Sequence, residues 1–489
     1  MGTAQTAQTT ETERATAAVR ISKPLAAQPT TIPGLTLFNL PVHGDNRGWF
    51  KENWQRQKMT ELGLPDFGPV QNNISFNASR GTTRGIHAEP WDKYISVATG
   101  SVFGAWVDLR QGSTFGRVFT AVIDPSTAIF VPRGVGNAFQ SLEDNTAYTY
   151  LVNDHWSAEA EEQYTFLSLA DSTAAIDWPI PLDQAELSDK DRAHPQLAEV
   201  EPMAPATTLV LGATGQLGRE LFRQLADRPG VEFLGRDRFD LADPAAVGRI
   251  DWRRVDTVVN AAGYTAVDEA ETVDGGRAAW ATNAEGVARL AQACAQHQVT
   301  LIHVSTDYVF DGAKEGAYTE SDPLRPVNAY GTSKAAGDLA VGVVPRHYLL
   351  RTSWVIGDGK NFVRTMQRLA ERGIAASVVS DQVGRLTFTR DLAEAIIHLR
   401  NGNAPYGTYN VTNGGEPGSW AEVARLVYTH AGRQQQDVTE VTTEEYFAGK
   451  SVARRPLNSV LDLTKLEASG FTPRDQWEAL EEHLAASQA

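Results

Sequence analysis

The chain has 489 residues, of which 42% are hydrophobic and 21% are charged, and its formal net charge is −16. That length exceeds what one hydrophobic core supports, and the composition is that of a folded globular protein. The negative charge argues against nucleic acid and against an anionic membrane surface as partners. The single cysteine, Cys294, excludes an intrachain disulfide and a cysteine-based zinc site. We recognise no long apolar run and no signal peptide, and therefore expect a cytoplasmic protein.

β-rich runs alternate with turn residues in the first part of the chain. Before them, residues 1–30 lack periodicity, which predicts a disordered tail. The runs occupy residues 94–97, 102–109, 118–123, 128–131 and 146–152. Their spacing, with Gly, Pro, Asn and Asp between them, predicts an all-β sandwich or barrel over residues 31–191. Residues 192–206 contain three prolines without periodicity and are predicted to form a linker.

From residue 207 to residue 489, short apolar runs alternate with Ala-rich helical stretches. This alternation predicts an α/β domain with a doubly wound parallel sheet of the Rossmann type. The first run, 209–211, leads into a glycine-rich loop and then a helix. Glycines there let the backbone approach a pyrophosphate, which a helix N-terminus favours electrostatically. A dinucleotide site is therefore predicted, with a merely tight strand-to-helix turn as the alternative. Its loop residues are Gly212, Thr214, Gly215, Gln216, Leu217 and Gly218.

The end of the second apolar run, residues 231–234, bears on the choice of cofactor. An acidic residue there suits the ribose hydroxyls of NAD, whereas an arginine suits the 2′-phosphate of NADP. The sequence offers both, as Arg236, Asp237 and Arg238. The two arginines favour NADPH, and NADH is the alternative. The other predicted cofactor contacts follow the second and third runs: Asp240, Leu241, Ala261, Ala262 and Tyr264.

Tyr330 and Lys334, one helical turn apart, give the catalytic signal. Such spacing places both on one helix face, and a neighbouring ammonium lowers the pKa of a phenol so that it exchanges a proton near neutral pH. Thr306 or Ser305 follows another apolar run, 301–304, at a strand end where such sheets bind ligands. Either hydroxyl would hydrogen-bond a reacting carbonyl, and a strand-end cap is the alternative interpretation of Thr306.

These motifs, with three further stretches at residues 260–268, 351–355 and 381–385, resemble the dTDP-4-dehydrorhamnose reductases, a family of extended short-chain dehydrogenases. The resemblance runs from about residue 207 to 485 and implies a small substrate-binding subdomain beside the Rossmann sheet. Leu386 departs from the family, which usually has a proline there. No metal-ligand spacing compels a metal. The implied catalytic set is Thr306, Tyr330 and Lys334, with Trp354 and Arg385 near the sugar nucleotide.

Polar side chains gather in three stretches of the β-rich part, where cations, amides and an aromatic ring suit a phosphate and a base. They are Arg47, Phe50 and Glu52, then Gln71 and Asn73, then Arg84 and His87, with Lys93 and Tyr150 further along. A lone histidine in a β protein is more often structural. Neighbouring cations nevertheless suit His87 for proton transfer on an anionic ligand.

A cupin-like metal site often uses a His-x-His pair, a later glutamate and a distant histidine. Here His87 is followed by Ala88 and Glu89, and residues 132–137 supply no histidine. Too few ligands remain for a metal site, so we expect metal-free chemistry.

These stretches resemble the dTDP-4-dehydrorhamnose 3,5-epimerases over about residues 32–192. The resemblance implies an all-β double-stranded β-helix, a cupin-like jelly roll. It implies His87 as the base, Tyr150 as the acid on the opposite sugar face, and Lys93 as the stabiliser of the C4 enolate oxygen. Asp191 would orient His87, with Asp171 as the second choice. The implied nucleotide contacts are Arg47, Phe50, Glu52, Gln71, Asn73, Arg84 and Asn137.

The chemistry of the substrate agrees with these residue types. Carbons 3 and 5 flank a ketone at C4, so their protons are acidified, and a histidine can remove a proton that a tyrosine returns. Two positions depart from the family, because Asn137 stands where a histidine is usual and Gly104 where an aspartate is expected. They leave open whether C3, C5 or both carbons are epimerised.

Together the resemblances imply a fused sugar-nucleotide epimerase and reductase that makes dTDP-L-rhamnose from dTDP-4-dehydro-6-deoxy-glucose with NADPH. The expected partner is a dTDP-sugar substrate, a uridine nucleotide stays open, and the oligomeric state is also open, with a homodimer as one candidate. One alternative is a reductase with a partial, altered or non-catalytic front domain. Another is a non-catalytic regulatory binding protein on the reductase fold.

Overall fold

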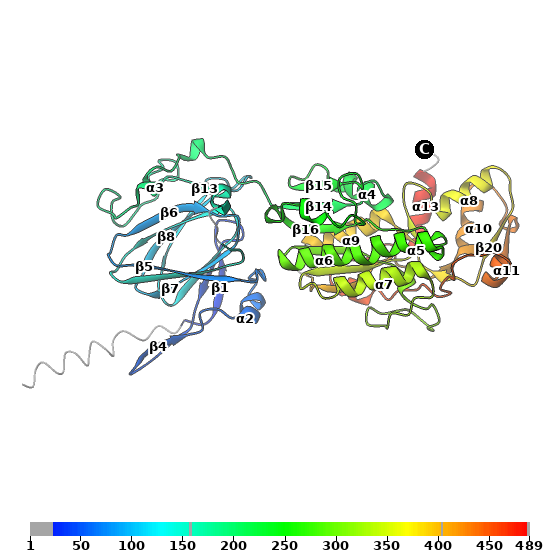
Figure 1. The fold of residues 1–489 in the computed structure, drawn as a ribbon, viewed down its shortest axis with the longest axis horizontal. Coiled ribbons are helices and arrows are strands. Elements are labelled where there is room, and N and C mark those ends of the chain that lie inside the picture. The colour runs from blue at the N-terminus through cyan, green and yellow to red at the C-terminus, as the bar shows by residue number, and fades with distance from the viewer. Residues whose placement is uncertain (1–22, 156–158, 402–403, 487–489) are drawn as a thin grey trace, which may run out of the picture. The chain divides into compact units, whose positions relative to one another are not determined.

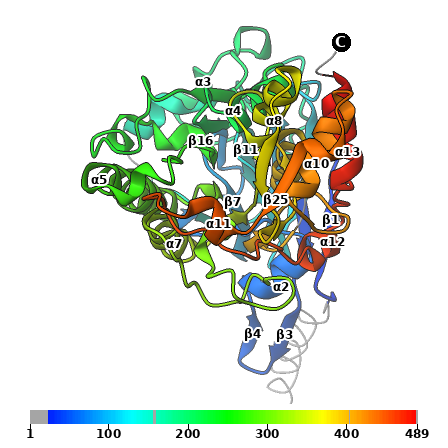
Figure 2. The ribbon, with the colours of Figure 1, turned by 90° about the vertical axis from the view of Figure 1, so that its right-hand side faces the viewer.

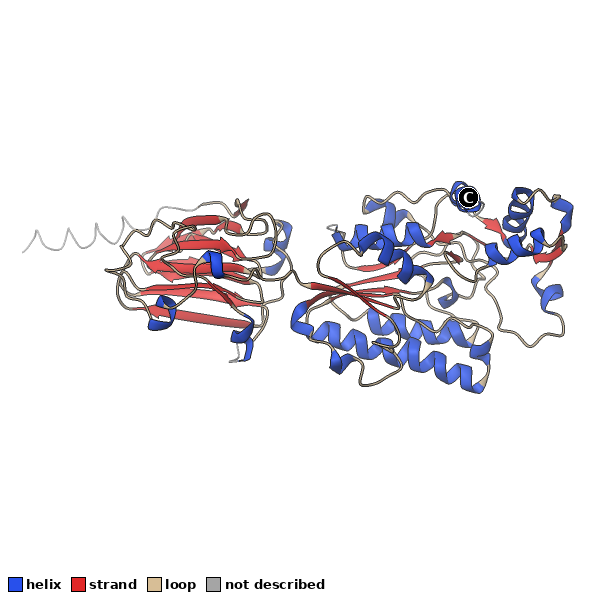
Figure 3. Cartoon of the chain, turned by 90° about the horizontal axis from the view of Figure 1, so that it is seen from above, coloured by secondary structure: helices blue, strands red, loops and turns tan. Residues whose placement is uncertain are grey.

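The computed structural model describes residues 23–155, 159–401 and 404–486, and the chain divides into two compact units, Met1–Pro205 and Ala206–Ala489 (Figure 1). The first unit is built mainly of strands, and the second of alternating strands and helices (Figure 3). The predicted combination of an all-β part with an α/β part is therefore confirmed. None of the helices in these ranges combines the length and apolarity that crossing a membrane requires.

Two antiparallel sheets make up the first unit and share a core. In strand order, one sheet is β1 (Ala26–Pro29), β2 (Thr36–Asn39), β10 (Thr127–Val131), β7 (Lys93–Thr99), β12 (Thr146–Val152) and β5 (Gln71–Asn77), and the other is β13 (Thr165–Phe166), β6 (Thr83–Ala88), β11 (Val135–Ser141), β8 (Val102–Asp108) and β9 (Val118–Ile123). Because side chains alternate between strand faces, Ile95 and Ile129 of the first sheet pack with Trp106 and Phe139 of the second. All the predicted β-rich runs coincide with strands.

A separate hairpin, β3 (Val42–Asp45) and β4 (Gly48–Lys51), extends away from these sheets (Figures 1 and 2). The backbone N–H and the guanidinium of Arg47 donate to the Asp45 carboxylate and close its turn. Among the described residues of this unit the α-helices are short: α2 (Arg56–Glu61) and α3 (Asp189–Arg192).

The structure differs from the predicted tail and linker. Residues 1–22 of the tail lie outside the described residues, whereas 26–29 form strand β1. In the predicted linker 192–206, Leu197, Val200 and Met203 are buried in the core of the first unit. Their three-residue spacing puts apolar side chains on one side of the segment, a pattern that its prolines concealed.

A six-stranded parallel sheet forms the centre of the second unit. Its strand order is β15 (Val231–Leu234), β14 (Thr207–Leu211), β16 (Val255–Asn260), β17 (Thr300–Val304), β18 (His347–Arg351) and β23 (Gly407–Asn410). After β14 the chain adds β15 on one side and then returns to place β16 on the other. At such a switch the carboxyl ends of the strands open a crevice.

Helices cover both faces of this sheet (Figure 3). Leu209 and Leu211 of β14 pack with α6 and α7, whereas Val210, which points the other way, packs with α4 and α9. The predicted doubly wound arrangement is thus present. The helices are α4 (Gln216–Leu225), α5 (Val273–Trp280), the π-helical segment Ala281–Gly286, α6 (Val287–Gln296), α7 (Ala329–Val341), α8 (Phe362–Glu371), α9 (Thr389–Asn401), α10 (Trp420–His430), α11 (Thr443–Phe447), α12 (Thr464–Ala468) and α13 (Gln476–Ala486).

A second core in this unit lies outside the main sheet. Val363 of α8, Val427 of α10 and Leu480 of α13 pack together there, beside the parallel pair β20 (Ala376–Val379) and β25 (Val438–Val441). Two smaller pairs lie nearby in sequence: β19 (Val355–Ile356) with β22 (Thr387–Phe388), and β21 (Val383–Gly384) with β24 (Gly418–Ser419). This lobe corresponds in sequence to the predicted small subdomain.

Candidate active sites

The glycine-rich loop after β14 packs backbone against backbone. Gly212 adopts φ +79°, and a Cβ there would lie 2.7 Å from the backbone nitrogen of Ala262. A Cβ at Gly218 would collide with the Gly212 carbonyl oxygen. α4 begins at Gln216, and its N-cap residue, Gly215, has no capping side chain. The first N–H groups of the helix are thus available to an anion, which the helix dipole favours.

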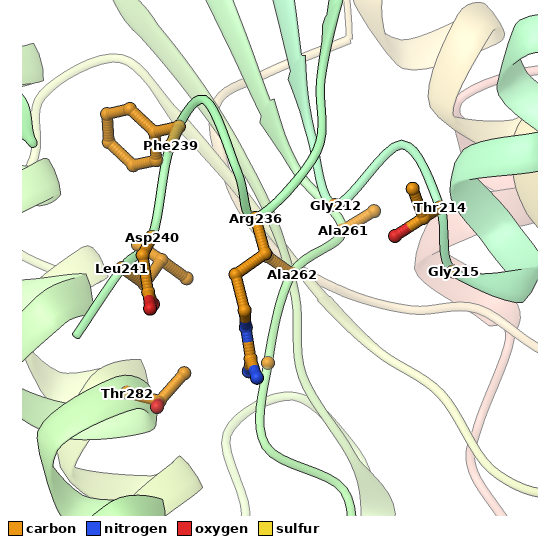
Figure 4. A pocket seen from close by; sticks show the side chains of 11 residues that line it. Gly212, Thr214, Gly215, Arg236, Phe239, Asp240, Leu241, Ala261, Ala262 and Thr282 are labelled. Carbon is orange, nitrogen blue, oxygen red and sulfur yellow. The ribbon is translucent and has the colours of Figure 1, made fainter. Parts of the chain in front are cut away.

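A pocket of about 300 Å³ opens beside this loop, at the ends of β14, β15 and β16 (Figure 4). The Arg236 side chain extends into it, whereas Arg238 is ion-paired with Glu232. All the predicted cofactor residues line the pocket except Gln216, Leu217, Gly218 and Tyr264. Sequence reasoning missed Phe239, Gly263 and Thr282, which also line it.

Thr306, Tyr330 and the predicted cofactor residue Tyr264 come together beside the carboxyl end of β17. Tyr264 packs against the cluster of Tyr330, Ala270 and Ala279 and does not line the pocket. The Thr306 hydroxyl accepts from the Tyr308 backbone N–H at 3.2 Å and donates to the Asp307 carboxylate at 3.0 Å. Thr306 is therefore a cap and is also held in place by Asp307, a buried residue that sequence reasoning missed. Burial raises the pKa of Tyr330, and the Thr306 hydroxyl acts in the opposite direction.

Lys334 lies on the same helix as Tyr330, but its side-chain nitrogen turns to the sheet. Its Nζ donates to the Val304 carbonyl at 2.7 Å and lies 3.3 Å from Nε2 of His303. Burial lowers the pKa of Lys334 to about 8, and Asp338 acts in the other direction. The predicted lowering of the Tyr330 pKa by Lys334 is therefore not what this structure has, because burial of the phenol dominates.

The predicted sugar-nucleotide residues of this unit belong to its second lobe. Trp354 has φ +47° and stacks on Trp420 with ring centroids 3.8 Å apart. Arg385 donates to the Gly415 and Leu461 carbonyls. The departure at Leu386 has a physical reason, because its backbone N–H donates to Oε1 of Gln476 at 2.9 Å and a proline has no such N–H.

An irregularity in β6 orients the polar residues of the first unit. β11 pairs Asn137 with His87 and Phe139 with Arg84. The paired residues are three positions apart in β6 but only two apart in β11, so β6 contains one extra residue, a β-bulge. Residues paired across antiparallel strands share a face, and Arg84 and His87 therefore lie on the same side of the sheet. Asn137 accepts a hydrogen bond from the Tyr148 hydroxyl at 3.2 Å on that side.

His87 is paired with Asp191, as predicted. Its Nε2 lies 3.0 Å from Oδ1 of Asp191, which α3 supplies from 104 residues further along the chain. Burial raises the pKa of Asp191, but hydrogen bonds from His87 and Ser188 outweigh burial and lower it. The carboxylate is thus ionised near neutral pH and can stabilise a protonated imidazole. Asp171, the second choice, accepts from the backbone of Leu197 instead.

His194 brings a second imidazole to this pair, which sequence reasoning missed. Its ring lies 5.3 Å from that of His87 and stacks on Phe166, and its Nε2 is 3.9 Å from Oδ1 of Asp191. Burial, followed by His87, lowers the pKa of His194. The ligand atoms of His87, Asp191 and His194 lie within 4.8 Å of one another, so among the described residues these three could hold a metal ion. Their wide spacing in sequence hid this group, since a cupin-like site is expected to show a His-x-His pair.

A cavity of about 340 Å³ is lined by Gln71, Asn73 and Tyr150, with Glu89, Trp91 and Tyr164 among the residues that sequence reasoning missed. Lys93 forms a buried ion pair with Glu89, and its Nζ lies 5.5 Å from the centroid of the Tyr150 ring. Burial lowers the pKa of Lys93 to about 7, and the Glu89 carboxylate beside it favours the charged form. Burial raises the pKa of Tyr150, with Arg84 acting the other way.

The remaining predicted contacts divide into two groups. Gln71 donates to Asn73 at 2.7 Å at the cavity, and Arg84 donates to Asn77. Arg47, Phe50 and Glu52 belong to or directly follow the hairpin and do not line the cavity within this chain. The Gly104 departure is also explained, because a Cβ there would collide with the indole of Trp106.

Comparison with known proteins identifies both units. Residues 206–489 match the family model of the RmlD substrate binding domain, and residues 29–199 match that of dTDP-4-dehydrorhamnose 3,5-epimerase. The chain is 52% identical over 189 residues to the Protein RmlC homolog of Streptococcus pyogenes serotype M6, a match covering 37% of this chain and 95% of that protein. It is 40% identical over 292 residues to a dTDP-4-dehydrorhamnose reductase of Aggregatibacter actinomycetemcomitans, covering 56% and 97%.

A crystal structure of dTDP-4-dehydrorhamnose reductase from Bacillus anthracis in complex with NADP is also similar, with 32% identity and a TM-score of 0.53. That match covers 58% of this chain and 99% of the other. The chain therefore belongs to the RmlD reductase family through its second unit and to the dTDP-4-dehydrorhamnose 3,5-epimerase family through its first.

Proposed function

We propose that this chain is a bifunctional enzyme that makes dTDP-L-rhamnose. Its first unit epimerises C3 and C5 of dTDP-4-dehydro-6-deoxy-glucose, and its second unit reduces the C4 ketone. The observation that carries the proposal is the presence of two proton-transfer sites in one chain. His87 with Asp191 lies in the first unit, and Tyr330 with Thr306 lies in the second. We also assign the double-stranded β-helix arrangement to the first unit, on the basis of its two antiparallel sheets.

NADPH is the proposed reductant, and it supplies a hydride to C4. The residues fit it, since the Gly212–Gly218 loop opens onto a helix N-terminus and Arg236 extends into the adjoining pocket. The relative from Bacillus anthracis was solved with NADP. Arg236 is the proposed partner of the 2′-phosphate, because Arg238 is occupied by Glu232.

In the reductase site Tyr330 is the proposed proton donor to the C4 oxygen. Its raised pKa keeps the phenol protonated near neutral pH, which a donor requires. Thr306 is assigned to the same oxygen, to which its one hydroxyl proton, donated to Asp307 in this structure, turns when the substrate binds. Trp354 and Arg385 are assigned to the sugar nucleotide.

In the epimerase site His87 is the proposed base. Nε2 is engaged by Asp191, so Nδ1 is the nitrogen that takes the C3 or C5 proton. The Asp191 carboxylate stabilises the imidazolium that forms, and Lys93 stabilises the enolate oxygen at C4. Tyr150, protonated because its pKa is raised, returns a proton from the other face. Gln71, Asn73, Arg84 and Asn137 are assigned to the substrate.

We further propose a homodimer in which the hairpin of one copy completes the cavity of the other with Arg47, Phe50 and Glu52. Phe50 is 69% exposed on the hairpin, and edge strand β5 exposes Ile74 and Phe76 at 69% and 61%. Apolar side chains on a free edge strand favour association. Light scattering should give about twice the 53.2 kDa of the chain, and a monomer at working concentration contradicts this assembly.

Arg236→Ala tests the cofactor assignment. Loss of a charge-assisted contact with the 2′-phosphate should cost about 1.5–3 kcal/mol, or roughly 10- to 150-fold in NADPH affinity. NADH affinity should change little. Arg238→Ala is the matched control and should leave both affinities unchanged, because Arg238 is paired with Glu232. Equal losses for both cofactors in Arg236→Ala contradict the assignment.

Tyr330→Phe tests the reductase mechanism. Loss of the proton donor should slow ketone reduction by about 10²–10⁴-fold, measured as NADPH oxidation, with NADPH binding intact. Tyr446→Phe, which removes the hydroxyl of an exposed tyrosine on α11, is the control. Wild-type turnover in Tyr330→Phe removes this tyrosine from the mechanism. Absence of NADPH oxidation in the wild type favours the regulatory alternative.

His87→Ala tests the epimerase. In deuterated water it should abolish exchange of the C3 and C5 protons, followed by NMR, while the reductase still turns over substrate epimerised beforehand. His155→Ala, at an exposed histidine of the same unit, should exchange like the wild type. A folded wild-type protein that exchanges neither proton refutes the epimerase assignment, and exchange at one carbon identifies a partial activity.

A further inference from the structure

A chain of hydrogen bonds connects the dinucleotide pocket to Lys334 through two buried residues. The backbone N–H of Ala262, which lines the pocket, donates to Oδ1 of Asn260 at 3.1 Å. The side-chain amide nitrogen of Asn260 lies 2.9 Å from Nδ1 of His303, whose Nε2 is 3.3 Å from Nζ of Lys334. Asn260 and His303 are fully buried, so water supplies no alternative partner.

The donor and acceptor directions of these hydrogen bonds determine which ring nitrogen of His303 carries the proton. The Ala262 N–H needs an acceptor, so the amide oxygen of Asn260 faces it and the amide nitrogen faces His303. That nitrogen only donates, which makes Nδ1 of His303 the acceptor. A neutral imidazole carries one proton, and His303 therefore carries it on Nε2, the atom that faces Lys334.

An N–H group that points at Lys334 selects its neutral form. An ammonium has three N–H donors and no acceptor. Its N–H groups and the N–H of His303 would therefore point at one another without forming a hydrogen bond. A neutral amine accepts from Nε2 of His303 and still donates to the Val304 carbonyl at 2.7 Å. Burial acts in the same direction, lowering the pKa of Lys334 to about 8 and that of His303 well below its ordinary value.

The other ionisable groups around Lys334 do not reverse this preference. Asp338 on the same helix favours the ammonium, but Arg351 of β18 lies 3.1 Å from its carboxylate and competes for that charge. Asp307 is occupied by the hydroxyls of Thr306 and Ser459. Tyr330 carries no charge near neutral pH, because burial raises its pKa.

We propose that His303, oriented by Asn260, is a positioning residue that favours the neutral amine of Lys334 while the pocket is empty, and that in alkaline solution dinucleotide binding draws a proton from solvent onto Lys334. This rests on the proposed function of the pocket as a dinucleotide site. The incoming dinucleotide brings negative phosphates into a pocket that the hydrogen bonds from Ala262 connect to Lys334, and negative charge favours the ammonium. In alkaline solution the cation expected from the sequence to lower the Tyr330 pKa then arises only when the reductant is in place.

Calorimetry of NADPH binding in two buffers of different protonation enthalpy measures this uptake directly. Below about pH 8, the pKa of Lys334 in the empty site, the amine is already protonated and uptake is small. Above that pH uptake should approach one proton per site. By linkage, the apparent Kd of NADPH should then rise by up to about tenfold per pH unit.

Two variants reverse the hydrogen-bond polarity. In Asn260→Asp the carboxylate accepts from both Ala262 and Nδ1 of His303, which leaves Nε2 as an acceptor for the ammonium. In His303→Gln the amide oxygen can accept from Lys334 directly. Both variants should keep Lys334 charged at about pH 9, abolish the uptake and flatten the pH dependence of Kd. The matched control, His347→Gln at the opposite end of the sheet, should behave as the wild type.

The outcomes separate this proposal from the one it rests on. Wild-type protein that binds NADPH at about pH 9 without proton uptake overturns the inference and leaves the dinucleotide site standing. A folded variant of either kind with wild-type uptake also overturns it. A thermal melt identifies a variant that fails to fold. In that case the proton uptake of the wild-type protein alone decides whether the inference holds. Wild-type protein that binds no NADPH refutes the proposed function itself.

Discussion

The register of three parallel strands is the constraint on which the second unit depends. Leu211 of β14 pairs with Asn260 of β16, and Asn260 pairs with His303 of β17. Neighbouring strands lie about 4.8 Å apart, so Asn260 and His303, at one level and on one face, meet directly. A slip of β17 by one residue would turn His303 to the opposite face and would shift Val304 and Thr306 with it. The glycine loop, the contact of Lys334 and the position of Thr306 thus follow from one pairing.

In the first unit, polar residues come together on one face because the pairing register is interrupted rather than regular. Without the irregularity in β6, Arg84 and His87 would point to opposite faces, because three steps along a regular strand reverse the side-chain direction. The extra residue brings both to the face of Asn137. Asp191 then arrives from a short helix far along the chain and is buried beside His87. Buried apolar residues of the segment that follows α3, Leu197 and Met203, hold that part of the chain against the sheets.

Local patterns predicted what depends on local geometry. The strand, glycine loop and helix around Gly212 were readable because backbone conformation and close approach demand glycine there. The helical spacing of Tyr330 and Lys334 was readable too, but where the Lys334 side chain points was not. That direction is set by the Val304 carbonyl and by His303 on another element. His194 and the ion pair of Glu89 with Lys93 escaped notice because nothing in their sequence neighbourhood shows which groups they meet. The core position of Leu197 and Met203 was hidden for the same reason, since prolines dominate the local pattern.

Burial of a lysine recurs in both units, and its surroundings differ as the two proposed reactions require. Both reactions place negative charge on the same C4 oxygen of the sugar. In epimerisation the enolate persists between loss and return of a proton, so a lasting cation is needed, and Glu89 beside Lys93 favours the ammonium against burial, which lowers the pKa of Lys93 to about 7. In reduction the oxygen is protonated by Tyr330 as the hydride arrives, so a charge is useful only once the reductant is bound. A neutral imidazole rather than a carboxylate faces Lys334, which leaves its charge to be set by the dinucleotide. The partner of each lysine, Glu89 or His303, thus matches how long the C4 oxygen stays negative in each unit.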